Sequence, residues 1–237
     1  MNILINGASR GIGAEMVRVF TREGHCVVFT YKNSESEAKA LEKETGALSV
    51  RADSADDSDV KNAVDAATDH YGKTDVLINN AAISKIGLFT ETSAEEWNEV
   101  INVNLNGFFR FCRAVLPQMI SAHYGKIINI SSMWGICGSS CEVAYSTSKA
   151  AVIGMTKALA KEVGPSNITV NCIAPGLIET EMNSSLSDET VKSLVDETPM
   201  MRIGTTRDVA ELALFLADDK SGFITGEVVN VNGGFLT

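Results

Sequence analysis

Short apolar runs alternate with helical patterns along the whole chain, and this alternation limits the fold more than any other feature. Two of the runs, VLIN and KIINI, are almost continuously apolar, which is typical of strands that helices cover on both faces. Strands and helices that alternate in this way form a parallel sheet through right-handed crossovers. The sequence therefore predicts an α/β fold with a doubly wound parallel sheet.

The expected elements follow from these patterns. Strands are expected at residues 2–6, 26–30, 47–51, 75–79, 126–131, 168–173 and 227–231. Helices are expected at residues 11–23, 34–45, 56–71, 93–106, 107–122, 144–163, 187–197 and 206–217. No internal repeat and no shift in composition divides the chain, so residues 1–237 are expected to form a single domain.

Composition and charge argue against several classes of protein. The net charge is −10 and no cluster of Lys and Arg occurs, so we expect no binding to nucleic acid. The 5 cysteines include no Cys-x-x-Cys pair, which indicates neither a disulfide framework nor a metal site and suits a reducing cytoplasm. The chain begins without the features of a signal peptide and contains no run of about 18 apolar residues. We therefore expect a cytoplasmic protein without a membrane span.

The first expected strand leads directly into a glycine-rich turn and then a helix. The turn reads Gly7-Ala8-Ser9-Arg10-Gly11-Ile12-Gly13. Glycine lets the backbone approach a pyrophosphate closely, and the N–H groups at the start of the next helix point at that anion. The same stretch also matches G-x-S-x-G, the nucleophile turn of α/β-hydrolases. That alternative requires a later histidine as the base, and none follows the sixth expected strand.

The end of the second expected strand bears on the choice of dinucleotide. An acidic residue about 20 positions after the glycines usually binds the ribose 2′-hydroxyl of NAD. Here Thr30, Tyr31 and Lys32 occupy that region, with Arg10 in the glycine turn. Because these cations suit a 2′-phosphate, the sequence favours NADP(H) over NAD(H).

Three residues suggest proton transfer. Tyr145 and Lys149 lie four positions apart in an expected helix, so they share one face, and Ser132 follows the fifth expected strand. Lowering the pKa of a phenol from about 10 to about 7 takes roughly 4 kcal/mol. One ammonium at about 4 Å supplies about that much at an effective dielectric constant near 20. The pattern predicts an acid–base tyrosine made acidic by a neighbouring lysine.

With these pieces in place, the chain closely resembles the short-chain dehydrogenase/reductase family over its whole length. The matching motifs are NGASRGIG, Asp53 after the third strand, NNAA at 79–82, Asn104, Ser132, the Tyr145-x-x-x-Lys149 pair and PGLIET at 175–180. The resemblance implies a Rossmann-type, seven-stranded sheet in the order 3-2-1-4-5-6-7. Two departures occur, because Asn6 replaces the usual Thr and Ala82 replaces the usual Gly.

The resemblance also implies residue roles. Tyr145 would be the acid–base, Ser132 would polarise the carbonyl, Lys149 would bind the nicotinamide ribose, and Asn104 would hold a proton-relay water. Asp53 would contact adenine, and Asn80 would lie along the cofactor. The residues expected to contact NADP(H) are Gly7, Ser9, Arg10, Gly11, Ile12, Gly13, Tyr31, Lys32, Asp53, Asn80, Ala81, Tyr145, Lys149, Pro175, Gly176, Ile178 and Thr180.

Within the family, the glycine turn, NVNL and the ending ITGEVVNVNGG resemble 3-oxoacyl-acyl-carrier-protein reductases of fatty acid synthesis. These enzymes tend to carry Arg just before the fifth and sixth strands, where this chain has His123 and Ser166. The stretch from Ser132 to Ser146 instead resembles reductases of the 5-aminopentanone group on elongation factor P, and Glu142 would face its amine. The carrier-protein activity is the first expectation, and elongation factor P is the alternative. A non-catalytic NADP(H) sensor is a remote third, since such sensors usually lose the Tyr–Lys pair.

The expected substrate region and assembly complete the picture. Residues 177–203 are expected to contact the ketone, with the helix after Ser187 as a lid. Expected pocket walls are Ile83, Met133, Trp134 and Met182. The resemblance further implies a homotetramer built on the helices near 107–122 and 144–163.

Overall fold

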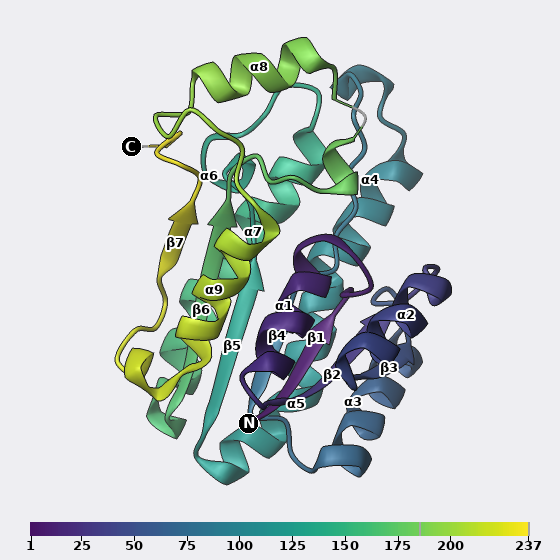
Figure 1. The fold of residues 1–237 in the computed structure, drawn as a ribbon, viewed down its shortest axis with the longest axis vertical. Coiled ribbons are helices and arrows are strands. Elements are labelled where there is room, and N and C mark those ends of the chain that lie inside the picture. Colours follow the sequence, from purple (N-terminus) through teal and green to yellow (C-terminus); the bar gives the residue numbers. More distant parts are fainter. Residues whose placement is uncertain (185, 237) are drawn as a thin grey trace.

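A computed structural model describes residues 1–184 and 186–236. Its centre is a parallel 7-stranded sheet in the order β3-β2-β1-β4-β5-β6-β7 (Figure 1). The strands are β1 (Asn2–Asn6), β2 (Cys26–Tyr31), β3 (Leu48–Arg51), β4 (Val76–Asn79), β5 (Gly125–Ile130), β6 (Ile168–Pro175) and β7 (Val228–Val231). The expected strands and their order are confirmed. The reversal of strand order between β1 and β4 places the carboxyl ends of both strands beside one crevice, where ligands of such sheets bind.

Helices cover both faces of the sheet. One face carries α1 (Gly11–Arg22), α2 (Glu35–Thr45) and α9 (Thr206–Ala217). The other carries α3 (Asp57–Tyr71), α5 (Gly107–Ala122) and α7 (Val143–Val163). Each layer buries aliphatic side chains against the strands, which is why β4 and β5 are buried along their whole length. None of the helices in the described chain combines the length and apolar character of a membrane span.

Shorter helices gather at the carboxyl ends of the strands. They are α4 (Ala94–Ile101), α6 (Trp134–Cys137) and α8 (Asp188–Asp196), and all three lie in the upper part of Figure 1. Side chains cap two of them, because Ser93 accepts a hydrogen bond from the Glu96 N–H in α4 and Ser187 accepts one from Thr190 in α8. The short helix α6 was not expected from the sequence. These helices and their loops lie above the carboxyl ends of the strands (Figure 1).

The expected helix 107–122 is confirmed as α5, but the expected helix 93–106 is not a single α-helix. Helix α4 ends at Ile101, and a π-helical turn, Asn102–Asn106, leads directly into α5 without a break. A π-turn contains one extra residue per turn and occurs frequently at functional sites. Asn104 lies in this turn, and its side chain is fully buried.

Candidate active site

The glycine turn lies between β1 and α1, as expected. Gly7 has φ +65, and a Cβ there would lie 2.6 Å from the Cα of Ala81. The Gly7 N–H donates to Thr30 Oγ1 at 3.0 Å, and the Ala8 N–H donates to the Thr30 carbonyl at 2.9 Å. The turn is therefore held against the ends of β2 and β4, and only glycine fits its first position.

The start of α1 fits a pyrophosphate. In the described chain, no side chain caps α1 and its first turn contains no acidic residue. A Cβ on Gly11 would meet nothing nearer than Thr180 Cγ2 at 3.6 Å, so the backbone lies beside open space. Uncapped N–H groups and the positive end of the helix dipole attract an anion. The residues present are thus suited to the phosphates of a dinucleotide.

Asn6, which departs from the family pattern, joins the ends of β1 and β4. Its Oδ1 accepts hydrogen bonds from the N–H groups of Asn80 and Ala81, both at 2.7 Å, and its Nδ2 donates to Asn79 Oδ1 at 3.2 Å. Asn80, expected along the cofactor, donates through Nδ2 to the Gly7 carbonyl at 2.6 Å. Both asparagines therefore shape the glycine turn.

Ser9 lies in the same turn, at the carboxyl end of β1. The three histidines lie on the opposite side of the sheet, near the amino ends of the strands. His25 precedes β2, His70 lies near the end of α3 before β4, and His123 precedes β5. Because a serine nucleophile needs its base within hydrogen-bonding reach, the structure does not support the hydrolase alternative.

Tyr145 and Lys149 lie in the first part of α7, and Ser132 lies just beyond β5. Tyr145 is 9% exposed, Ser132 8% and Lys149 1%. The Lys149 Nζ donates to the Ile130 carbonyl at 2.8 Å and lies 5.6 Å from the centroid of the Tyr145 ring. The three side chains therefore meet at the carboxyl end of β5.

Burial changes the acidity of both residues. It raises the pKa of Tyr145 to about 12, the nearby Glu142 carboxylate adds to the rise, and the Ser132 hydroxyl opposes it. Burial lowers the pKa of Lys149 to about 8. The expectation of a Tyr145 pKa near neutrality is wrong for the protein alone, because desolvation raises the pKa of the phenol and the Lys149 ammonium donates to the Ile130 carbonyl instead. The pair consists of a phenol that keeps its proton and a lysine that titrates in the working range.

If the chain catalyses the ketone reduction expected from its sequence, this pair predicts a pH dependence for that reaction. The Lys149 pKa of about 8 lies below its ordinary value, so the ammonium is present at lower pH and is lost as the pH rises through about 8. We expect kcat to be constant on the acidic side and to fall about tenfold per pH unit above the pKa, because each unit removes about nine-tenths of the cation. Stopped-flow measurement of the reduction step checks this.

The control for the pH profile is Lys149→Arg, which keeps its charge because arginine stays protonated. The kcat of this variant should be lower than that of the wild type, but it should no longer fall as the pH rises above about 8. A wild-type kcat that stays flat to about pH 10 would contradict the role of Lys149, since the group would then not titrate in that range.

Asn104 is connected to α7, the helix that carries Tyr145 and Lys149. Its Oδ1 accepts from the Ile83 N–H at 2.8 Å, and its Nδ2 donates to the Ile83 carbonyl at 2.9 Å and to Ser148 Oγ at 3.0 Å. Ser148 Oγ donates in turn to the Tyr145 carbonyl at 2.7 Å. Asn104 thus ties the loop after β4 to the turn of α7 that bears Tyr145.

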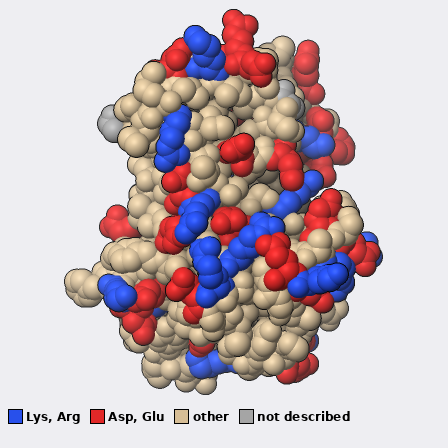
Figure 2. All heavy atoms as spheres, viewed as in Figure 1, with Lys and Arg blue, Asp and Glu red and all other residues tan. Residues whose placement is uncertain are grey.

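The cations expected at a 2′-phosphate carry carboxylate partners. Lys32 Nζ lies 2.7 Å from Asp53 Oδ2, and Arg10 Nε lies 3.5 Å from Glu181 Oε2. Lys32 and Arg10 are more than half exposed, so these ion pairs are weak and exchangeable. Tyr31 is buried. Figure 2 shows basic side chains intermixed with acidic ones over one face of the molecule.

Four residues of the PGLIET motif lie at the end of β6 or between β6 and the glycine turn. Gly176 N–H donates to the Val231 carbonyl at 2.9 Å, and the Pro175 carbonyl accepts from Met133 N–H at 2.8 Å. Ile178 is buried, and Thr180 Cγ2 would lie 3.6 Å from a Cβ at Gly11. The motif therefore connects β6 and β7 with the glycine turn.

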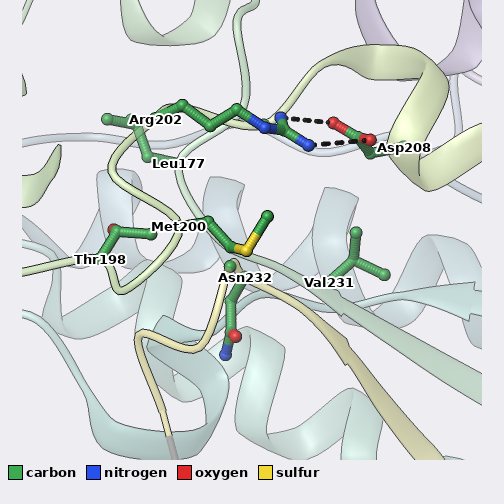
Figure 3. Close-up of a pocket in the computed structure, with 9 residues that line it drawn as sticks. Leu177, Thr198, Met200, Arg202, Asp208, Val231 and Asn232 are labelled. Carbon is green, nitrogen blue, oxygen red and sulfur yellow. Dashed lines mark hydrogen bonds and ion pairs between the residues drawn. The ribbon is translucent and has the colours of Figure 1, made fainter.

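The expected substrate region, 177–203, contains α8 and a short turn at Glu181–Asn183, while Ser185 and, at the chain end, Thr237 lie outside the described residues. A cavity of about 180 Å³ is lined by residues of this region together with Val231, Asn232 and Gly233. Figure 3 shows Met200 below the paired Arg202 and Asp208. The Asn232 side chain points away from that ion pair. Of the expected walls, Met133 is buried and Met182 is 49% exposed.

Two further residues contact segments that carry expected site residues, and no motif pointed to them. Ser84 Oγ donates to Glu142 Oε1 at 2.6 Å, which joins the loop after β4 to the start of α7. Arg110, an isolated charge in the apolar stretch FFRFC, is only 15% exposed as a side chain. The charge of Arg110 within this apolar stretch is the only feature of the sequence that could have indicated it. Within residues 1–184 and 186–236, no group of His, Cys, Asp and Glu is arranged to hold a metal ion.

Comparisons with known proteins cover almost the whole chain. Residues 7–236 match the family model described as enoyl-(acyl carrier protein) reductase. The 3-oxoacyl-[acyl-carrier-protein] reductase of Chlamydia trachomatis serovar D is 41% identical over 98% of this chain and 95% of its own length. The Thermotoga maritima enzyme of the same name is 39% identical, over 98% and 96%. A mutant short-chain dehydrogenase/reductase from Serratia marcescens superposes with a TM-score of 0.93 at 32% identity, covering 99% of this chain and 97% of its own.

Proposed function

Because this chain belongs to the short-chain dehydrogenase/reductase family, we propose that it uses NADPH to reduce the ketone of a 3-oxoacyl thioester carried on acyl carrier protein. The observation that carries the proposal is the meeting of Ser132, Tyr145 and Lys149 at the strand ends beside a glycine turn suited to phosphates. The curated relatives named above are all carrier-protein reductases, which supports this substrate.

In the proposed reaction, each side chain of the site has a separate role. NADPH, when bound, supplies the hydride. The Ser132 hydroxyl holds the carbonyl oxygen, and the Tyr145 hydroxyl, which keeps its proton because burial raises its pKa to about 12, donates that proton to the same oxygen. The Lys149 ammonium stabilises the phenolate that remains, since the two groups share one face of α7. Asn104 would hold the water through which the proton is replaced.

The preference for NADPH is a second part of the proposal. Lys32 and Arg10 supply positive charge at the end of β2 and in the glycine turn, where an NAD enzyme usually has an acid. On this view a 2′-phosphate takes the place of the carboxylates that now pair with these cations.

The substitution Lys32→Ala tests this preference. We expect the Kd for NADPH to rise roughly 10-fold, the loss of one charged hydrogen bond, with the Kd for NADH unchanged. Fluorescence titration of both nucleotides measures it. The control is Lys39→Ala, which removes an exposed lysine of α2 that pairs with Glu42 at 3.0 Å. An equal rise for NADPH and NADH would contradict the role of Lys32 in cofactor choice.

The direct experiment is turnover of acetoacetyl-acyl carrier protein and acetoacetyl-CoA, followed by loss of NADPH absorbance. Rapid turnover of the carrier-bound thioester is expected. One structural finding makes the test necessary, because His123 and Ser166 replace the usual arginines and precede β5 and β6 at the edge of the sheet opposite the site. Neither position therefore offers an arginine to an acidic carrier protein.

A second candidate has one observation in its favour. Glu142 is half-buried, accepts a hydrogen bond from Ser84 and lies close enough to raise the pKa of Tyr145. A carboxylate beside the acid–base group suits a ketone that carries an amine, such as the 5-aminopentanone group on elongation factor P. Negligible turnover of both thioesters together with reduction of the modified factor would replace the first candidate by this one.

The remaining expectations stay predictions. Phe109 and Ile120 on α5 and Val143 at the start of α7 are exposed apolar residues, which supports a homotetramer built on these helices. Light scattering of the purified protein gives the assembly directly. The single domain of residues 1–237, the lid role of α8 and the cytoplasmic location are likewise proposals.

A further inference from the structure

Arg110 connects three segments that converge beside the π-turn. Its Nη1 donates to the Ser54 carbonyl at 3.3 Å and to the Asn102 carbonyl at 3.4 Å, and its Nε lies 3.3 Å from Asp57 Oδ2. Ser54 follows Asp53 in the loop after β3, Asn102 begins the π-turn, and Asp57 begins α3. An arginine can serve all three because its guanidinium carries five N–H donors in one plane.

The Asn102 carbonyl oxygen accepts hydrogen bonds from two groups. It accepts the Gly107 N–H in the π-helical pattern, and Arg110 supplies its second hydrogen bond. Gly107 packs tightly on the same loop, because a Cβ there would lie 2.9 Å from Ser54 Cβ. The π-turn is therefore fixed at its first residue by Arg110 and just beyond its last by contact with Ser54.

Asn104 depends on the shape of this turn. Three hydrogen bonds join its side chain to Ile83 and Ser148, and such bonds tolerate little displacement. If the turn relaxed to an ordinary α-helix, residues beyond it would rotate and Asn104 would no longer face Ile83.

We propose that Arg110 is a positioning residue that holds the π-turn so that Asn104 faces the loop after β4 and α7. Arg110 acts through Asn104 and does not touch the reacting atoms. The catalytic part of this inference rests on the proposed function, because Asn104 matters to the rate only if the chain reduces a ketone. The structural part, in which Arg110 holds the π-turn and positions Asn104, does not depend on the proposed function.

The first test measures the position of Asn104 without any substrate. The Ile83 N–H donates to Asn104 Oδ1, so its hydrogen exchange reports on that side chain. In Arg110→Met we expect exchange of the peptide around Ile83 and of residues 102–107 to be roughly 10-fold faster, with strand β5 unchanged. The matched control is Arg113→Met, an exposed arginine three residues later on α5. Unchanged protection at Ile83 in Arg110→Met would overturn the proposal.

The second test measures catalysis. Arg110→Met is expected to lower kcat roughly 10- to 100-fold at a nearly constant KM for the ketone, the effect of a misplaced group. The double variant Arg110→Met with Asn104→Ala should be no slower than Asn104→Ala alone, because the arginine acts through the asparagine. Fully additive losses would overturn the proposal.

The two tests separate failure of this inference from failure of the proposed function. If the wild-type protein reduces neither thioester nor the modified factor, the proposed function has failed, and hydrogen exchange at Ile83 still decides the role of Arg110. If turnover is rapid and Arg110→Met retains it with normal protection, only the role of Arg110 has failed. Normalising kcat to bound NADPH removes the effect of any unfolded fraction.

Discussion

Replacing Tyr145 by Phe is expected to lower kcat for ketone reduction by about 1,000-fold, within the range that general acid catalysis contributes. The variant loses one hydroxyl and keeps the buried ring, so the fold should be unchanged. Without that hydroxyl, the proposed mechanism loses the group that donates a proton to the carbonyl oxygen held by Ser132. Single-turnover measurement of NADPH consumption at saturating substrate gives the chemical step directly.

The control for this substitution is Tyr124→Phe. Tyr124 donates its hydroxyl to Asp219 at 3.1 Å, and both residues lie at the ends of helices away from the strand exits. Its kcat should match that of the wild type within a factor of about two, as expected for a surface hydroxyl. Near-normal turnover in Tyr145→Phe would remove the acid–base assignment and with it the proposed mechanism.

The second large effect is expected from Gly13→Ala. A Cβ at Gly13 would lie 2.6 Å from the Ala8 Cα, 2.8 Å from the Gly7 carbonyl oxygen and 2.8 Å from Asn80 Nδ2. Two of these are backbone atoms of the glycine turn, so the turn itself must move. We expect the Kd for NADPH to rise at least about 100-fold, because the displaced turn can no longer direct its N–H groups at the pyrophosphate, with a loss of stability of about 1–3 kcal/mol from overpacking.

Gly154→Ala is the matched control, since it adds the same methyl group to the interior of α7, where no described atom beyond the neighbouring residues and backbone of its own helix lies within 4 Å of the new atom. This variant should bind NADPH normally and gain about 0.5–1 kcal/mol of stability, because alanine favours a helix over glycine. Isothermal titration and thermal unfolding of both variants provide the comparison. Tight NADPH binding by Gly13→Ala would show that the turn does not hold the phosphates.

Much of the site could be predicted from residue spacing, because the residues of each motif lie close together in the sequence. The glycine turn follows an apolar strand, and Tyr145 and Lys149 lie four residues apart in one helix. Such short-range patterns carry their own geometry, so a strand exit and a helix face can be placed without knowledge of the rest of the fold. The parallel sheet follows in the same way from continuous apolar strands.

Long-range contacts account for what the patterns missed. Asn6 and Asn80, which are 74 residues apart, meet only because β1 and β4 are neighbours in the sheet. The π-turn had no sequence signal, because its stability comes from Arg110, Ser54 and Ile83, which lie in three separate segments. The pairing of Lys32 with Asp53 likewise depends on the pairing of β2 with β3.

The amino-acid sequence by itself determined the doubly wound sheet, the glycine turn and the membership of Ser132, Tyr145 and Lys149 in one site, because apolar periodicity and spacing are properties of the chain. Only the tertiary structure decided the acidity of that site. Burial at the end of β5 raises the pKa of Tyr145 to about 12 and lowers that of Lys149 to about 8, since desolvation depends on every segment packed around the two groups.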